Sequence, residues 1–208
     1  MSFGAFLSQG GWAMGPIYLC SVVAFGVFIK KILEFRGARM GDLGWFDAFI
    51  EALRTKDVDR LGRSLDGPSH PGTRVLMAGL RVRRLGPEHV AAEARRVGTL
   101  ELERAEAYLP ILSFIAQAAP LLGLLGTVLG MVDLFQGLQS AGLDAIDLAQ
   151  LSSGIWKALL TTAAGLTVAL PTLAAYSYLA RRAETLRVQL SNLTQTTLTE
   201  LALQAERD

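Results

Sequence analysis

The chain has 208 residues, of which 51% are hydrophobic and 19% are charged, and its formal net charge at pH 7 is +1. Because the charges nearly balance and no basic patch carries interleaved aromatic residues, the composition argues against a nucleic-acid-binding protein. Within these residues the single cysteine, Cys20, excludes a disulfide framework and a zinc site built from several cysteines. Charged residues are almost absent from three long windows, which divides the sequence into membrane and aqueous parts.

The first of these windows, residues 1–29, contains no charged side chain. From Trp12 onward it is long enough to cross about 30 Å of hydrocarbon, and Trp12 and Tyr18 suit the outer interface. A cleaved signal peptide is disfavoured because basic residues follow the apolar run instead of preceding it. We therefore predict that residues 1–40 form a transmembrane helix with a periplasmic amino terminus and a basic cytoplasmic end. The basic residues of that end are Lys30, Lys31, Arg36 and Arg39.

Residues 41–106 are the only substantial polar region, and apolar residues recur in it at helical spacing. We predict a cytoplasmic helical insert, broken at 66–68, 70–72 and 86–87 by glycine and proline. The last helix is expected to start near Pro87 and to run straight into the second span. Neither His70 nor His89 has a second histidine or a cysteine at i+3 or i+4, so no metal or cofactor is expected there. The apolar stripes are Phe46, Phe49, Ile50 and Leu53, then Val75, Leu76 and Leu80, then Val90, Ala94 and Val97.

The second span is predicted at residues 107–135 and contains the stretch QAAPLLGLLGTVLG at 117–130. In water each glycine would cost about 1 kcal/mol relative to alanine and the proline about 3 kcal/mol, so a soluble core helix is not expected here. In lipid, the pairs Gly123/Thr127 and Gly126/Gly130 have the small-xxx-small spacing that lets helices approach closely. One face of this helix therefore indicates either a tight helix contact or a lined cavity. That face comprises Ser113, Gln117, Pro120, Gly123 and Thr127.

A short linker at residues 136–153 carries Asp144 and Asp147 but no lysine or arginine, which is typical of the non-cytoplasmic side. The third span is predicted at 154–182 and ends in Arg181 and Arg182, so the carboxyl terminus is expected in the cytoplasm. Residues 183–208 are predicted to continue as an amphipathic cytoplasmic helical tail. Its apolar residues are Val188, Leu190, Leu193, Leu198 and Leu201.

Two adjoining faces of the third span hold small and polar residues. One has Ala158, Thr162, Gly165 and Ala169, and the other has Lys157, Thr161, Ala164 and Val168. Lys157 is the only charged residue within 107–132 and 154–180, the parts of the second and third spans that lie between their charged ends, and such residues are by default candidates for function. It lies about 36 Å from Arg181 along the helix axis, where a lysine can also reach the interface. Lys157 therefore either extends its ammonium group to the membrane interface or pairs with Asp144, Asp147 or a partner chain.

The sequence shows no set of a nucleophile, a base and an orienting side chain that could act together in catalysis. The glycines of the second span are not followed by Gly-Lys-Ser/Thr, so they do not form a phosphate-binding loop. An enzyme is therefore not expected. Two blocks of the chain instead resemble the signature segments of the MotA/TolQ/ExbB proton-channel family, most closely its ExbB/TolQ branch. These blocks are APLLGLLGTVLG at 119–130 and GIWKALLTTAAGL at 154–166. The order of the three spans, their predicted orientation and the cytoplasmic insert also match the pattern of this family. The resemblance implies an all-α membrane protein with three transmembrane helices.

The resemblance further implies a homo-oligomer, a pentamer, around a pore that holds a dimer of an ExbD- or TolR-like single-span partner. A TonB- or TolA-like protein is a further implied partner, and the lipid bilayer surrounds the complex. In the family the partner supplies the proton-carrying aspartate, and this subunit supplies pore-lining threonines. Candidate ion-pathway residues are Thr127, Thr162, Lys157 and Thr161. Candidate helix-packing residues are Pro120, Gly123, Gly126, Gly130, Ala158 and Gly165.

One position departs from the pattern, because many ExbB and TolQ members carry a glutamate where this chain has Lys157. A carboxylate there could relay protons or set a negative pore potential, whereas an ammonium could do neither. Two hypotheses follow: a subunit of an ion-driven complex that couples proton-motive force to work at the cell envelope, or a non-conducting structural membrane scaffold. A small-solute transporter is disfavoured because three spans show no inverted repeat.

Overall fold

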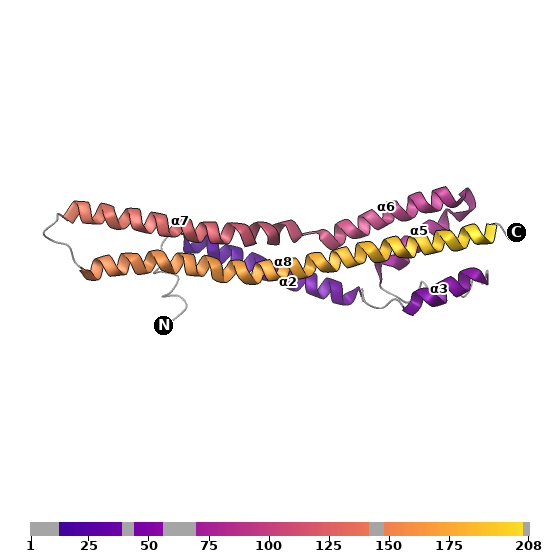
Figure 1. Cartoon of the computed structure of the whole chain (residues 1–208), viewed down its shortest axis with the longest axis horizontal. Helices are drawn as coiled ribbons and strands as arrows, with labels where there is room; N and C mark the ends of the chain where they lie inside the picture. The colour runs from indigo at the N-terminus through magenta and orange to yellow at the C-terminus, as the bar shows by residue number, and fades with distance from the viewer. Residues whose placement is uncertain (1–12, 39–43, 56–69, 142–147, 206–208) are drawn as a thin grey trace. The chain divides into compact units, whose positions relative to one another are not determined.

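The computed structural model describes residues 13–38, 44–55, 70–141 and 148–205. All regular structure in these ranges is helical, which confirms the predicted all-α class. Three helical segments, Met14–Gly37, Pro87–Gln139 and Leu151–Gln204, include stretches long and apolar enough to cross a membrane. The helices are α2 (Met14–Gly37), α3 (Gly44–Arg54), α5 (Pro71–Arg81), the 3-10 turn η1 (Arg83–Leu85), α6 (Pro87–Glu106), α7 (Leu109–Ala141) and α8 (Leu148–Ala205) (Figure 1).

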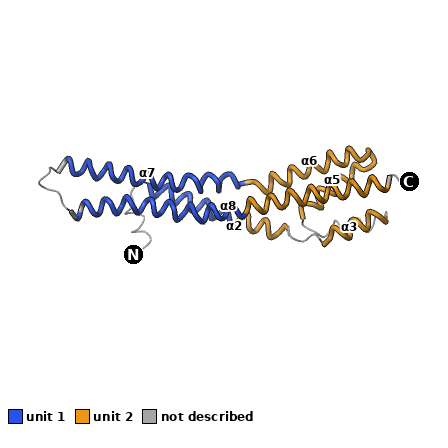
Figure 2. The backbone as a smooth tube through the Cα atoms, in the orientation of Figure 1, with its two compact units in different colours: residues 1–29, 108–178 blue, residues 30–107, 179–208 orange. Residues whose placement is uncertain are grey.

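The chain divides into two compact units. Unit 1 comprises residues 1–29 and 108–178, and unit 2 comprises residues 30–107 and 179–208 (Figure 2). Both α2 and α8 pass from one unit to the other as continuous helices. Unit 1 therefore contains most of the apolar sequence, and unit 2 contains the polar insert together with the carboxyl-terminal part of α8.

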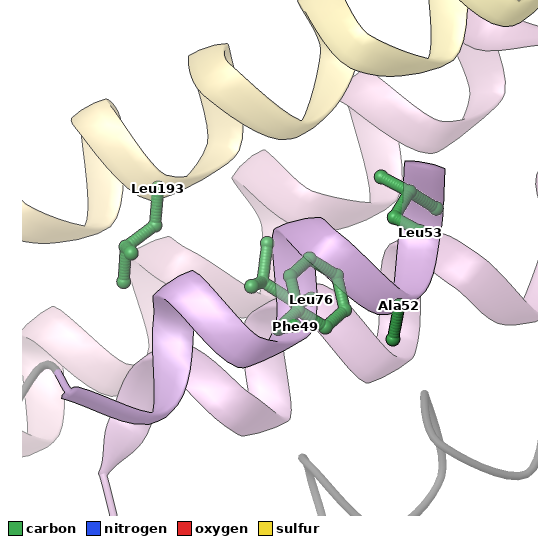
Figure 3. Close-up of a cluster of buried hydrophobic side chains, with 5 residues drawn as sticks. All are labelled: Phe49, Ala52, Leu53, Leu76 and Leu193. Carbon is green, nitrogen blue, oxygen red and sulfur yellow. The ribbon is translucent and has the colours of Figure 1, made fainter. Parts of the chain in front are cut away.

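The core of unit 2 joins the insert to the tail of α8. Its buried residues are Phe49, Ala52, Leu53, Leu76 and Leu193 (Figure 3). The predicted stripes are buried here in part, since Val75, Val90 and Ala94 are also buried. In the predicted apolar face of the tail, Leu190 and Leu193 are buried but Val188 is 51% exposed. The tail thus packs on the insert by a narrower stripe than its apolar residues suggest.

The start of α5 shows why the sequence His70-Pro71-Gly72 is a boundary. His70 is the N-cap, and its Nδ1 accepts a hydrogen bond of 3.0 Å from the Gly72 N–H. Pro71 occupies the first helical turn, where its missing N–H costs nothing. A Cβ on Gly72 would lie 2.6 Å from Leu193 Cδ1, so the tail of α8 packs directly against this turn. The predicted break at residues 66–68 lies outside the described residues.

The prediction that the helix starting at Pro87 runs straight into the second span was wrong. Helix α6 does begin at Pro87, but it ends at Glu106, and α7 begins only at Leu109. Between them Tyr108 has a φ of 71°, which is left-handed. The physical reason is Pro110: in a continuous helix its ring would clash with the carbonyl of Glu106, and it has no N–H to donate.

The carboxyl end of α6 is closed by a buried lysine from α2. Lys31 has no exposed surface, and its Nζ donates to the Arg104 carbonyl at 2.9 Å and to Glu34 Oε2 at 3.0 Å. It also lies 5.3 Å from the centre of the Phe35 ring. The last carbonyls of a helix have no partner within the helix, so a cation at this end satisfies one of them and opposes the negative end of the helix dipole. Part of the basic cluster that marks topology in the sequence therefore also has a structural role.

Candidate functional site

The candidate site is the contact between α7 and α8 inside unit 1, where backbones touch. A Cβ on Gly123 would lie 2.9 Å from the Thr161 carbonyl oxygen and 3.0 Å from Thr162 Cα. A Cβ on Gly165 would lie 2.5 Å from the Ala119 carbonyl oxygen. Backbone atoms cannot move aside as a flexible side chain can, so only glycine fits at these two positions.

The contact continues along α7 through Gly126 and Gly130. A Cβ on Gly126 would lie 2.6 Å from Thr161 Oγ1 and 3.0 Å from the Ala13 Cβ, while one on Gly130 would lie 3.2 Å from the Ala158 Cβ. As the residue numbers rise along α7 they fall along α8, so the two helices are antiparallel. The small residues that the sequence places on separate helices therefore form one packed seam.

Two threonine hydroxyls lie close to the Gly123 carbonyl within this seam. Thr162 Oγ1 donates to the Gly123 carbonyl at 3.1 Å. Thr161 Oγ1 lies 2.7 Å from the Ala158 carbonyl and 3.3 Å from the Gly123 carbonyl. A hydroxyl has one hydrogen, so Thr161 donates to only one of these carbonyls at a time. The Gly123 carbonyl thus accepts from Thr162, and it is also within reach of Thr161 when that hydroxyl turns away from the Ala158 carbonyl.

Thr161 is more deeply packed than its sequence pattern predicts. The pattern places it on the face of Lys157, adjoining the small-residue face, but Thr161 is only 1% exposed and fills the space beside Gly126. The spacing of Thr161 from the small residues of α8 already indicates this position. Thr161 lies three residues after Ala158 and four before Gly165, which places it on the same side of the helix as both.

The other predicted polar residues do not join this oxygen cluster. Thr127 is half-buried, and its hydroxyl donates to the Leu124 carbonyl of its own helix at 2.6 Å. Gln117 is exposed and bonds to Ser113, also within α7. Pro120 is half-buried in α7 beside Ala119, which packs on α8. The predicted polar face of α7 is therefore split, with only Gly123 in the seam.

Lys157 is exposed on α8, one turn before the buried Thr161. Its predicted partners within the chain, Asp144 and Asp147, lie outside the described residues. In the isolated chain the Lys157 ammonium thus points away from the packed seam rather than into it. A neighbouring chain, lipid headgroups or water can reach it.

Residues 68–192 match the model of the MotA/TolQ/ExbB proton channel family, and this range includes α7 and the part of α8 that forms the seam. The chain belongs to this family. It is 32% identical over 170 residues to the putative biopolymer transport protein ExbB-like 1 of Synechocystis, covering 78% of this chain and 64% of the relative. It is 39% identical over 99 residues to the Tol-Pal system protein TolQ of Pseudomonas aeruginosa, covering 48% and 42%.

A putative ExbB homolog of Methanothermobacter thermautotrophicus is 32% identical over 186 residues, covering 86% of this chain and 64% of the relative. The chain therefore spans less than two thirds of the length of each of these three relatives. Their names place it on the ExbB/TolQ branch, as its two signature blocks predict. With three helical segments able to cross a membrane, this member of the MotA/TolQ/ExbB family is a multi-pass membrane protein in a family of transport proteins, not of enzymes.

Proposed function

We propose that this chain is the ring-forming subunit of an inner-membrane complex driven by protons. Five copies surround a dimer of an ExbD- or TolR-like single-span partner, with the amino terminus periplasmic and the carboxyl terminus cytoplasmic. The complex couples proton-motive force to work at the cell envelope, such as biopolymer uptake through a TonB- or TolA-like protein. Family membership and the names of the relatives support this proposal.

The observation that carries the proposal is the oxygen cluster of Thr161, Thr162 and the Gly123 carbonyl in an otherwise apolar part of α7 and α8. Polar groups in hydrocarbon are costly, and where they gather they mark ion routes more often than lipid-facing surface. A threonine hydroxyl can both donate and accept, so a small rotation about its side chain would turn it from Gly123 toward a protonated group on the partner. The backbone-to-backbone packing around it would keep its position fixed while it turns.

The role of Lys157 differs from that of the glutamate in many relatives. Its position on the exposed side of α8 leaves two arrangements under the proposal. Either the proton route uses only the partner's aspartate with Thr127 and Thr162, or Lys157 pairs with an acidic residue of the partner and holds it in register. In neither arrangement does Lys157 carry the proton.

The decisive experiment measures proton uptake into vesicles that contain this chain and its partner. Thr162→Val removes the hydroxyl while keeping the shape, and we expect it to lower the flux at least about tenfold, as loss of a positioned proton-transfer group does. Thr185→Val is the matched control, because Thr185 lies in the same helix, is exposed and donates its hydroxyl to the Arg181 carbonyl of its own helix. We expect its flux to match that of the unmodified chain.

Equal flux for the two variants would contradict the proton route through this seam. The ring itself is tested separately by native mass spectrometry of the purified complex, for which the expected stoichiometry is five copies of this chain to two of the partner. A different ring size with intact flux would overturn the pentamer but not the conduction.

A non-conducting scaffold is the second candidate, and one observation favours it. In the isolated chain each of the hydroxyls of Thr127, Thr161 and Thr162 already donates to a carbonyl of the chain itself. Threonines in this state stabilise helix packing and need no proton route to explain them. A scaffold predicts a stable oligomer whose vesicles show no proton uptake at any membrane potential.

A further inference from the structure

A groove of about 520 Å³ runs between α2 and α8 in unit 1, away from the α7–α8 seam. Its walls are mostly apolar and come from the membrane-spanning stretches of both helices. Among the lining residues are Ala24, Phe25 and Phe28 of α2 and Val168, Ala174 and Tyr178 of α8. In a bilayer the surroundings of such a groove are hydrocarbon, so some apolar group must fill it.

The polar atoms on the α8 wall do not require a polar occupant. Thr167 Oγ1 donates to the Ala163 carbonyl at 2.8 Å, and Thr172 Oγ1 donates to the Val168 carbonyl at 2.7 Å. Their hydroxyl hydrogens are therefore used within α8. Apart from these two threonines, Ser21 and Tyr178, the lining residues are apolar, so the groove fits a hydrocarbon chain.

The cross-section of the groove favours a lipid chain over a helix of another protein as its occupant. Along α8 the lining extends from Thr167 to Tyr178, which is about 16 Å at the helical rise. A volume of 520 Å³ over that length leaves a mean cross-section of about 30 Å². An α-helix with its side chains is about 10 Å wide and has a cross-section of roughly 80 Å². A single extended hydrocarbon chain therefore fits within the groove, whereas a helix of another protein could lie in it only with part of its surface.

The sequence beyond the groove indicates which lipid would be held. Arg181 is exposed and follows Tyr178 by three residues in the same helix, and Arg182 comes next. In α2, Lys30 follows Phe28 by two residues. Basic side chains at the end of a span attract anionic headgroups, at about 1 kcal/mol for each lysine or arginine near the surface.

We propose that this groove binds one acyl chain of an anionic phospholipid, with the headgroup toward the Arg181 end of α8. This site is separate from the threonine cluster and does not depend on the proposed proton conduction. It would make the lipid a structural part of the subunit, because the chain would fill space between α2 and α8 that their own side chains leave open.

The test is native mass spectrometry of the full chain released from nanodiscs of equal parts phosphatidylglycerol and phosphatidylcholine. Ala174→Phe places a ring in the groove, while Ala163→Phe adds the same ring to an exposed alanine of α8 that does not line the groove. We expect one retained lipid per chain for the unmodified protein and for Ala163→Phe, and loss of it for Ala174→Phe. Retention by Ala174→Phe, or equal loss in both variants, would overturn the site.

The headgroup is tested by the ratio of retained phosphatidylglycerol to phosphatidylcholine. Arg181→Gln should lower this ratio about fivefold, the factor that corresponds to about 1 kcal/mol for one basic residue. Arg83→Gln is the control, since Arg83 is an exposed arginine of the η1 turn. An unchanged ratio in Arg181→Gln would show that the headgroup does not lie at this end.

Two further measurements keep the result interpretable. Ala174→Leu fills less of the groove and replaces the phenylalanine variant if that variant loses helical circular dichroism. Ala174→Cys in a Cys20→Ala background tests for a second copy of this chain in the groove. Efficient disulfide cross-linking between chains there would overturn the lipid site, and we expect none.

Discussion

The glycines of the α7–α8 seam differ from the other glycines of the chain in what surrounds them. A Cβ on Gly165 would press on the Ala119 carbonyl, whereas a Cβ on Gly26 in α2 would meet nothing within 4 Å. The same amino acid therefore has two roles in the membrane-spanning helices. In the seam it permits backbone contact, and at Gly26 it leaves open space.

This contrast gives a prediction for the pair of substitutions. Gly165→Ala should lower the free energy of unfolding by about 1–3 kcal/mol, because a backbone carbonyl has to move to admit the methyl group. Gly26→Ala should leave stability equal or raise it by up to about 1 kcal/mol. Reversible unfolding in mixed detergent micelles measures both, and an equal response of the two variants would show that the seam does not pack as described.

Lys31 is the residue for which charge alone predicts the wrong environment. It belongs to the basic cluster after the first span, yet it is buried and donates to the Arg104 carbonyl. Lys31→Met should destabilise the protein by about 1–3 kcal/mol, because that carbonyl is left buried without its donor. Arg36→Met, an exposed change in the same helix, should stay within about 0.5 kcal/mol. The same unfolding assay distinguishes them, and a neutral Lys31→Met would rule out the cap.

At the scale of the helices, the break between α6 and α7 is the feature that the pattern of apolar residues did not predict. Helical periodicity continues across it, since residues on both sides favour helix. The helix is instead interrupted by Pro110 and by the left-handed backbone of Tyr108. A left-handed backbone costs a residue other than glycine about 1–2 kcal/mol, so the break persists only because the continuous helix is worse.

Replacing Pro110 should therefore favour one continuous helix over the broken arrangement of α6 and α7. Pro110→Ala restores an N–H that can donate to the Glu106 carbonyl, and we expect slower amide hydrogen exchange at residues 107–112 as α6 and α7 join. Pro87→Ala is the control, because Pro87 lies in the first turn of α6, where no intrahelical bond is missing. Unchanged exchange at 107–112 in Pro110→Ala would mean that contacts around Tyr108 hold the break, not the proline.

At the scale of the whole molecule, each unit has its own packing chemistry. Unit 1 is held by glycine seams and backbone contact, while unit 2 has a core of large apolar side chains with ion pairs around it. One of these joins Arg187 to Glu106 at 3.0 Å, and another joins Arg54 to Glu200. The difference follows from the solvent: in lipid, burying leucine gains little, so close approach and hydrogen bonds dominate.

Because the two kinds of packing involve different residues, their free energies should add. Leu193→Ala removes a core side chain of unit 2 and should cost about 2–5 kcal/mol. Combined with Gly165→Ala, the total should equal the sum of the single changes to within about 0.5 kcal/mol, as expected for sites without shared partners. Leu203→Ala, at a leucine 42% exposed, is the control. A clear departure from additivity would show energetic coupling between the units.

Much of this protein was determined by the sequence alone. Charge-free windows predict three spans because hydrocarbon excludes ionised side chains, and the two signature blocks place the chain in its family. Helix starts at Pro71 and Pro87 were also predictable, because proline and the residue before it impose local geometry.

Only the tertiary structure decided which small and polar residues meet. Helical spacing places Thr161 within reach of two faces, and its burial against Gly126 depends on how α8 is rotated against α7. The same holds for Lys31, whose partner is 73 positions away in the chain. Contacts between distant segments depend on packing, and packing is set by the sum of many small contacts that no local pattern contains.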